Sequence, residues 1–137
     1  MNAEIKPRVL VIDDEMEVRT WLKGLLISLG CEIAGEAENG REGLELFKKE
    51  RPDLVLLDLN MPVMTGVEAL DFILGEDPEA NVIMLTSVTD EKVIQDRMIK
   101  GAQYYLPKHN PPDKIKAALQ ENIEKVKSNL GKSRDNE

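Results

Sequence analysis

Five short runs typical of β-strands, each followed by a longer segment of helical periodicity, constrain the fold of this chain more than any other feature. The runs cover residues 8–12, 32–37, 54–57, 82–85 and 103–106. Three of them are apolar almost without a break, which is typical of strands that are buried on both faces. Strands that alternate with helices predict an α/β fold, namely a doubly wound five-stranded parallel sheet with right-handed crossovers and helices on both faces.

The segments between the runs carry the signals of helices that pack on such a sheet. Apolar residues recur near every 3.6 positions in two of them; these residues are Val18, Leu22, Leu25, Leu26 and Leu29, and Ile115, Leu119, Ile123, Val126 and Leu130. Thr65 can cap a helix that runs to about Leu74, and a further helix is expected over about 90–100. Pro111 and Pro112 suit the first turn of the last helix. We therefore expect one domain over residues 1–130 and a polar, frayed tail over 131–137.

Composition narrows the class of protein. The chain has 137 residues, which suits one domain, and no apolar run approaches the roughly 20 residues of a membrane helix. The charged start lacks an apolar signal region, so a cytoplasmic protein is expected. With Cys31 and His109 as the only residues of their types, an intrachain disulfide and a Cys/His zinc site are excluded. We expect Cys31 to be a buried apolar residue rather than a reactive thiol. The net charge of −8 argues against nucleic-acid binding.

Polar residues follow four of the five predicted strands. Asp13 and Asp14 follow the first run, Asp58 the third, Thr86 the fourth and Lys108 comes shortly after the fifth. The carboxyl ends of parallel strands meet at one edge of the sheet, where α/β proteins of this kind bind ligands. Aspartate often follows a strand simply because it caps the next helix, which could explain Asp13 or Asp14. That explanation suits Asp58 poorly, because its next helix begins several residues later.

The residue types at this edge point to a particular chemistry. Clustered carboxylates repel one another unless a cation lies among them, and oxygen ligands without His or Cys suit a hard cation such as Mg²⁺. A carboxylate can act as a nucleophile and accept a phosphoryl group as an acyl phosphate. A metal ion and a lysine can neutralise the charge of the group in transfer. The pattern therefore predicts Mg²⁺-dependent phosphoryl transfer to an aspartate.

With these residues in place, the chain resembles the receiver domains of response regulators, including the stand-alone chemotaxis response regulators. The resemblance covers roughly residues 8–130 and depends on the order and spacing of several pieces, which are 9–15, 53–58, 60–66, 85–87, 101–102 and 105–108. It implies a flavodoxin-like sheet of order 2-1-3-4-5. It also implies a role in two-component signalling, with a histidine kinase or phosphotransfer protein as phosphodonor and a further protein as downstream target.

The resemblance assigns the phosphoryl and metal chemistry to four residues. Asp58 would be the phosphoacceptor and a metal ligand. Asp13 and Asp14 would hold Mg²⁺, and Asn60 would offer its backbone carbonyl to the same ion. The chain would catalyse only its own phosphorylation and dephosphorylation, and so would not be an enzyme with a separate substrate. It would be a monomer or a weak homodimer.

The resemblance assigns the conformational switch to the last two strands. Thr86 would turn its hydroxyl to the phosphoryl group, and Lys108 would pair with Asp58 or its phosphate. Tyr105 matches the aromatic residue that moves inward when Thr86 shifts. Ser87 is small, as access to Asp58 requires.

The chain departs from the family pattern after the lysine, where the family usually has proline and this chain has His109. A cis bond between Lys108 and His109 would cost about 2.5–4 kcal/mol. We therefore predict either a trans bond with a rerouted loop or a strained cis bond, and this leaves the reach of Lys108 open. In the family, positions such as those of Leu59, beside the acceptor, and Val88, two residues past Thr86, tune the access of water to the acyl phosphate. The apolar Val88 offers no side chain to orient that water. We expect the phosphorylated form to live for minutes or longer.

Three other functions remain to be weighed. A phosphatase with an aspartyl-phosphate intermediate commonly has a second acid two residues after its nucleophile, and Asn60 cannot serve as that acid. A nucleotide-binding module would need a glycine-rich loop after the first strand, where this chain has Asp13 and Asp14. A receiver fold that only docks, without phosphorylation, stays open because of the residue after Lys108.

Overall fold

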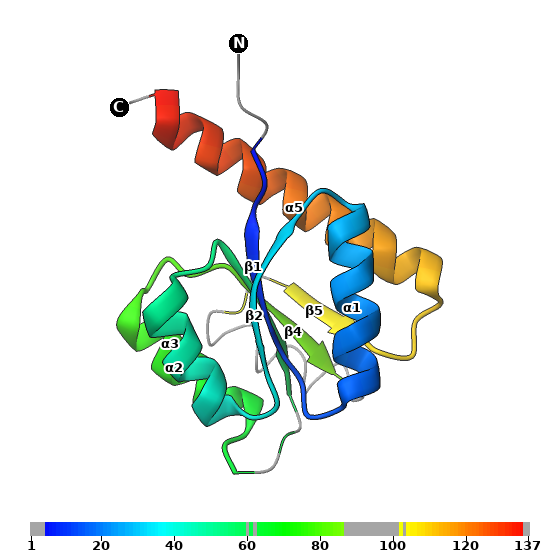
Figure 1. Cartoon of the computed structure of the whole chain (residues 1–137), viewed down its shortest axis with the longest axis vertical. Helices are drawn as coiled ribbons and strands as arrows, with labels where there is room; N and C mark the ends of the chain where they lie inside the picture. The colour runs from blue at the N-terminus through cyan, green and yellow to red at the C-terminus, as the bar shows by residue number, and fades with distance from the viewer. Residues whose placement is uncertain (1–4, 60, 62, 87–101, 103, 136–137) are drawn as a thin grey trace.

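The computed structural model describes residues 5–59, 61, 63–86, 102 and 104–135 (Figure 1). Within them lies one five-stranded parallel sheet of order β2-β1-β3-β4-β5, as predicted. The strands are β1 Arg8–Ile12, β2 Glu32–Ala37, β3 Leu54–Asp58, β4 Val82–Thr86 and β5 Tyr104–Pro107. The helices are α1 Met16–Ser28, α2 Gly40–Glu50, α3 Gly66–Glu76 and α5 Pro112–Asp135. The helix expected over about 90–100 and the first residue of the expected fifth strand, Gln103, lie outside the described residues.

The apolar runs of the sequence are explained by helices on both faces of the sheet. α1 and α5 cover one face, and α2 and α3 cover the other (Figure 1). Successive residues of a strand point to opposite faces. Val9 and Val11 therefore join the core beneath α1 and α5, while Leu10 and Ile12 join the core beneath α2 and α3. Only a strand with both faces covered needs an unbroken apolar sequence, so the pattern of β1 and β3 fixes their central place.

Side-chain caps stabilise the starts of two helices, and one of them, Thr65, was predicted. The side chain of Asn39 accepts a hydrogen bond from the backbone N–H of Glu42 at the start of α2. Thr65 caps α3 in a reciprocal arrangement with Glu68, a capping box that satisfies two backbone donors. α5 begins at Pro112, as expected.

The end of α5 differs from the prediction. The helix continues to Asp135, so residues 131–135 are helical, and the expectation of a frayed tail from residue 131 is wrong for that segment. Near this end, Gly131 lies against the side chain of Ile5 in the segment that precedes β1. A contact with a distant part of the chain is not visible in local polarity. The division of the chain at residue 130 stays a prediction.

Cys31 is buried directly before β2. Burial raises the pKa of its thiol to about 11, and the charge of Lys127 lowers the pKa by a smaller amount. It is therefore protonated at neutral pH and agrees with the expected apolar role. Among the helices of the described ranges, none is both long and apolar enough to span a bilayer.

Candidate functional site

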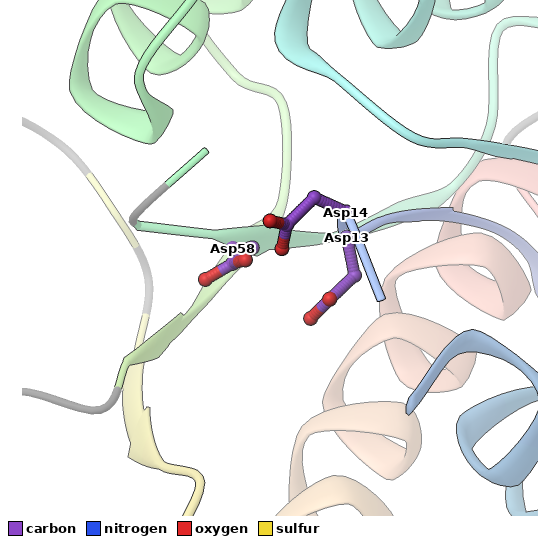
Figure 2. A group of neighbouring side chains, drawn as sticks. All are labelled: Asp13, Asp14 and Asp58. Atoms are coloured by element: carbon purple, nitrogen blue, oxygen red, sulfur yellow. The ribbon is translucent and has the colours of Figure 1, made fainter. Parts of the chain in front are cut away.

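Three aspartates converge at the carboxyl ends of β1 and β3 (Figure 2). Asp58 ends β3, and Asp13 follows Ile12, which pairs with Leu57 in the neighbouring strand, so the register brings Asp13 level with Asp58. One carboxylate oxygen from each of Asp13, Asp14 and Asp58 lies within 4.8 Å of the others. Asp13 and Asp58 are buried, at 0% and 2% exposure, while Asp14 is exposed. The cluster predicted from the strand ends therefore exists, with one of its members open to solvent.

Lys108 connects this cluster to the end of β5. Its Nζ lies 2.8 Å from Oδ2 of Asp13 and 3.2 Å from Oδ1 of Asp58. Burial lowers the pKa of Lys108, but the hydrogen bond to Asp13 and the charge of Asp58 outweigh that effect, so the pKa lies above its ordinary value. Lys108 is therefore an ammonium ion at neutral pH, shared between two carboxylates that repel each other.

The unusual residue after Lys108 does not prevent this contact. Among the described residues no peptide bond is cis, so the Lys108–His109 bond is trans, the first of the two predicted alternatives. The backbone N–H of Lys108 donates to the carbonyl of Thr86 at 2.7 Å, which continues the pairing of β4 with β5 up to the lysine. Because this backbone bond fixes the start of the loop, the path of the loop can change at His109 while the Lys108 side chain stays within reach of Asp58.

Two further predicted residues lie where the resemblance places them, although their roles stay predictions. Thr86 is fully buried at the end of β4, directly after Leu85, which pairs with Asp58. Tyr105 is buried on the face covered by α2 and α3, whereas Tyr104 is partly exposed. Asn60, Ser87 and Val88 lie outside the described residues.

The charges of the cluster suit a hard divalent cation. Asp13, Asp14 and Asp58 offer carboxylate oxygens, and Lys108 is the cation in contact with two of them. Three carboxylates and one ammonium group leave an excess of two negative charges among these four side chains. Buried carboxylates are stable together only when their charge is compensated. Oxygen donors with this excess of negative charge fit Mg²⁺ in both ligand type and charge.

Sequence reasoning missed Arg19, which approaches the cluster from α1. Its Nη1 donates to the backbone carbonyl of Asp13 at 2.7 Å, and its Nε donates to Oε1 of Glu36 in β2 at 2.9 Å. The signal available in the sequence was weak. Arg19 stands three positions before the core residue Leu22, at the border of the apolar stripe, where a long side chain can reach back over the end of β1.

The loop between β3 and α3 returns close to Asp58. The N–H of Gly66 donates to the carbonyl of Leu59 at 3.0 Å, and a Cβ on Gly66 would lie 2.2 Å from the carbonyl oxygen of Asp58. Before it, Val63 has a φ of 72° and is 78% exposed. A left-handed backbone is unusual for a β-branched residue and indicates strain that the surroundings hold in place.

A small apolar cavity of about 170 Å³ lies between α1 and α5, beside the site. Its lining residues are Val18, Trp21, Leu22, Leu85, Lys108 and Ile115. Trp21 and Lys108 thus border the same space. The indole is therefore placed to report on changes at Lys108.

A five-stranded sheet of this order, with an aspartate cluster and a lysine at its carboxyl edge, defines a class of protein. The model of the response regulator receiver domain family matches residues 9–120. The chain is 36% identical to the chemotaxis protein CheY of Thermotoga maritima over 112 residues, which cover 82% of this chain and 93% of that protein. The chain belongs to the response regulator receiver domain family, as the sequence predicted, and is a CheY-like receiver of two-component signalling.

Solved structures agree with this assignment. The structure of the CheX-CheY-BeF3-Mg complex of Borrelia burgdorferi matches with a TM-score of 0.80 and 30% identity, covering 89% of this chain and 90% of that chain. The signal receiver domain of a LuxO repressor protein of Vibrio parahaemolyticus matches with a TM-score of 0.81 and 26% identity, covering 91% and 95%. The same fold therefore occurs both in chemotaxis proteins and in receiver domains of other regulators.

Proposed function

We propose that this chain is a phosphorylation switch that accepts a phosphoryl group on Asp58 in the presence of Mg²⁺. The observation that carries the proposal is the position of Lys108 Nζ, which contacts the carboxylates of both Asp13 and Asp58 beside the exposed Asp14. A buried carboxylate with a cation on one side and metal-type ligands on the other is suited to accept a dianionic group. The phosphodonor would be the phosphohistidine of a histidine kinase or phosphotransfer protein.

Each residue then has a separate task. A carboxylate oxygen of Asp58 forms the new O–P bond while the P–N bond of phosphohistidine breaks, and the imidazole leaves with the electron pair. Asp13, Asp14 and Asp58 would hold Mg²⁺, with the backbone carbonyl of Asn60 as a further ligand. The bound ion supplies charge neutralisation at the transferring group. Lys108 provides a second positive charge, already in contact with Asp58.

The signal would leave the site through β4 and β5. Thr86 is buried next to Asp58, and its carbonyl accepts the N–H of Lys108, so both residues belong to one hydrogen-bonded strand end. A phosphoryl group on Asp58 would attract the Thr86 hydroxyl and the Lys108 ammonium together. Tyr105, two residues before Pro107, would respond to that shift, and a changed docking surface for a downstream protein would follow.

The chain would catalyse its own phosphorylation and dephosphorylation and would act on no other substrate. The docking-only function was left open by the residue after Lys108. The contact of Lys108 with Asp58 removes that particular argument, because the trans bond leaves the lysine within reach.

The proposal is tested by incubating the protein with Mg²⁺ and acetyl phosphate and measuring its intact mass. We expect one added phosphoryl group on the wild type and on Asp71→Asn, a matched change at an exposed aspartate of α3, and none on Asp58→Asn. An equal gain of mass in Asp58→Asn would place the acceptor elsewhere. If no form gains mass, and beryllofluoride with Mg²⁺ also leaves the amide spectrum unchanged, the phosphorylation switch is wrong and the docking-only function stands.

A further inference from the structure

The contacts of Arg19 join three parts of the molecule at one point. The guanidinium belongs to α1, donates to the carbonyl of Asp13 at the end of β1, and donates to Glu36 of β2. Its side chain is only 11% exposed. We propose that Arg19 is a positioning residue for the metal-binding turn, and that it holds Asp13 and Asp14 in the geometry that binds Mg²⁺. This inference rests on the proposed function and deepens it.

The Asp13 backbone is fixed from both sides. Its N–H donates to the carbonyl of Ala37 at 3.0 Å, and its carbonyl accepts the Arg19 guanidinium at 2.7 Å. A peptide unit is planar, so fixing the carbonyl of Asp13 also fixes the N–H of Asp14 and the direction in which its Cα leaves the strand. Asp14 is the exposed member of the cluster. The orientation of its carboxylate therefore depends on the peptide that Arg19 holds.

The Asp13 carboxylate is held as well, by other groups. Its Oδ1 accepts the backbone N–H of Glu15 at 2.9 Å, and its Oδ2 lies 2.8 Å from Lys108 Nζ. Since these contacts act on the side chain, they cannot replace a restraint on the Asp13–Asp14 peptide. Arg19 supplies that restraint from outside the set of metal ligands.

Arginine is suited to this task because its planar fork can serve two acceptors in fixed directions. Glu36 orients the fork through Nε and leaves Nη1 directed at the Asp13 carbonyl. Lysine, with a single ammonium group on a flexible stem, can reach either acceptor without fixing the angle between them. Arg19→Lys should therefore keep the positive charge but only part of the geometry.

If Arg19 acts only through its charge, its removal should have the opposite effect on Mg²⁺ binding from the one expected if it positions the turn. Arg19 carries a positive charge next to the metal-binding turn, so electrostatics alone would make its removal tighten Mg²⁺ binding. Loss of positioning would weaken it. Lys23 offers a matched control, because it also pairs with Glu36 and has the same charge, while the contact to the Asp13 carbonyl comes from Arg19.

The experiment measures the Kd for Mg²⁺, with MgCl₂ alone as the probe, by calorimetry and by the fluorescence of Trp21. We expect Arg19→Met to raise the Kd about tenfold, the lower end of the effect of removing a group that orients a metal ligand. Arg19→Lys should fall between Arg19→Met and the wild type, and Lys23→Met should change the Kd less than about twofold. Unchanged or tighter binding in Arg19→Met would overturn the inference.

A second measurement without metal separates this inference from the proposed function. Amide hydrogen exchange at Asp14 and Glu15 should become about tenfold faster in Arg19→Met and stay unchanged in Lys23→Met. If the wild type shows no saturable Mg²⁺ binding, the proposed function fails while the exchange data still decide the role of Arg19. Equal exchange rates at Asp14 in Arg19→Met and the wild type would mean that Arg19 only forms an ion pair with Glu36 and does not position the turn.

Discussion

The two loops that frame the aspartate cluster are held by different forces. The turn between β1 and α1 is held by charged contacts, from Arg19 to the Asp13 carbonyl and from Lys108 to the Asp13 carboxylate. The loop between β3 and α3 is held by close backbone packing, with Gly66 directly against Asp58. One side of the site should therefore be sensitive to lost charge and to ions, and the other to added atoms.

The packing on the second side extends to a neighbouring helix. A Cβ on Gly40, at the start of α2, would lie 2.9 Å from the carbonyl oxygen of Met64. Gly66 in turn begins α3 behind the capping box of Thr65 and Glu68. The loop is thus confined between the starts of two helices. Neither glycine is among the described residues with a left-handed backbone, so glycine is required at both positions because a side chain would not fit, and not because of the backbone φ angle.

The largest effect is expected from Gly66→Ala. A methyl group there would lie 2.2 Å from the Asp58 carbonyl oxygen and 2.7 Å from the Leu59 Cα, which are backbone atoms that cannot rotate away. We expect a loss of about 3 kcal/mol in the free energy of unfolding, measured by urea denaturation, together with slower phosphorylation.

Gly75→Ala in the same helix is the matched control for this change. Nothing lies within 4 Å of a Cβ at Gly75, so alanine should be neutral or should stabilise the helix by up to about 1 kcal/mol. If the two variants were equally stable, close packing would not be what holds the β3–α3 loop, and the contrast between the two loops would disappear.

The next largest effect tests the charged side, through Lys108→Met. Without its ammonium group, the buried carboxylates of Asp13 and Asp58 lose a cation that both contact. Breaking a fully buried ion pair costs about 3–5 kcal/mol; because Lys108 is partly exposed, we expect about 2 kcal/mol in metal-free buffer. Added Mg²⁺ should reduce this difference by at least half, because a second cation compensates the same carboxylates.

The control for Lys108→Met is Lys125→Met, at an exposed lysine that pairs with Glu121 within α5. Its effect should stay below about 0.5 kcal/mol and should not depend on Mg²⁺. A deficit in Lys108→Met that Mg²⁺ leaves unchanged would mean that the lysine acts through packing of its aliphatic stem rather than through charge.

The contrast between the loops also explains what the sequence could predict. Asp13, Asp14, Asp58, Thr86 and Lys108 were found because each follows an apolar strand, and parallel strands bring their carboxyl ends together. The order of the strands came from the resemblance, since alternation alone predicts a parallel sheet but not which strands are neighbours. The apolar run of β1 and the capping signal of Thr65 are local, and both were confirmed.

The restraints on the site could not be predicted in the same way. Arg19 reaches Asp13 and Glu36 only because α1 lies over the end of β1 beside β2, a relation between three elements. The need for glycine at position 66 depends on how closely the returning loop approaches Asp58. Local sequence gives neither distance. The trans bond at His109 was one of two predicted alternatives, and local sequence could not decide between them.

A smaller effect should follow from Val63→Asn in the closely packed loop. Val63 has a φ of 72° and an exposed side chain, so the substitution changes backbone preference with little loss of packing. A left-handed backbone costs most L residues about 1–2 kcal/mol, and asparagine tolerates it better than valine. We expect a gain of up to about 1 kcal/mol in thermal unfolding. Val63→Ala, which keeps a Cβ and lacks the amide, should gain less stability. A loss of stability in Val63→Asn would show that the valine side chain supports the loop.

The smallest effect concerns Glu36, which orients Arg19 on the charged side. Hydrogen bonds from Lys23 and then from Arg19 hold the pKa of Glu36 below its ordinary value of 4.5. A depressed pKa in the folded state means that the ion pairs stabilise the protein above the unfolded-state pKa and that this contribution is lost as the pH falls through the folded-state pKa. Since the carboxylate is about one-third exposed, Glu36→Gln should cost at most about 1 kcal/mol at pH 7.

That deficit should shrink as the pH falls through the lowered pKa of Glu36 in the folded protein, because the wild-type carboxyl then becomes protonated too. Urea unfolding of both proteins from pH 7 down to pH 3 would measure the deficit. The same measurement in high salt should also reduce it, because screening weakens exposed ion pairs, while the loss of stability in Gly66→Ala should stay unchanged. A deficit that does not change with pH would assign Glu36 a role in packing. A deficit that shrinks with acid and with salt, beside a Gly66→Ala deficit that salt leaves unchanged, would show that the β1–α1 turn is held by charge while the β3–α3 loop, on the same aspartate cluster, is held by space.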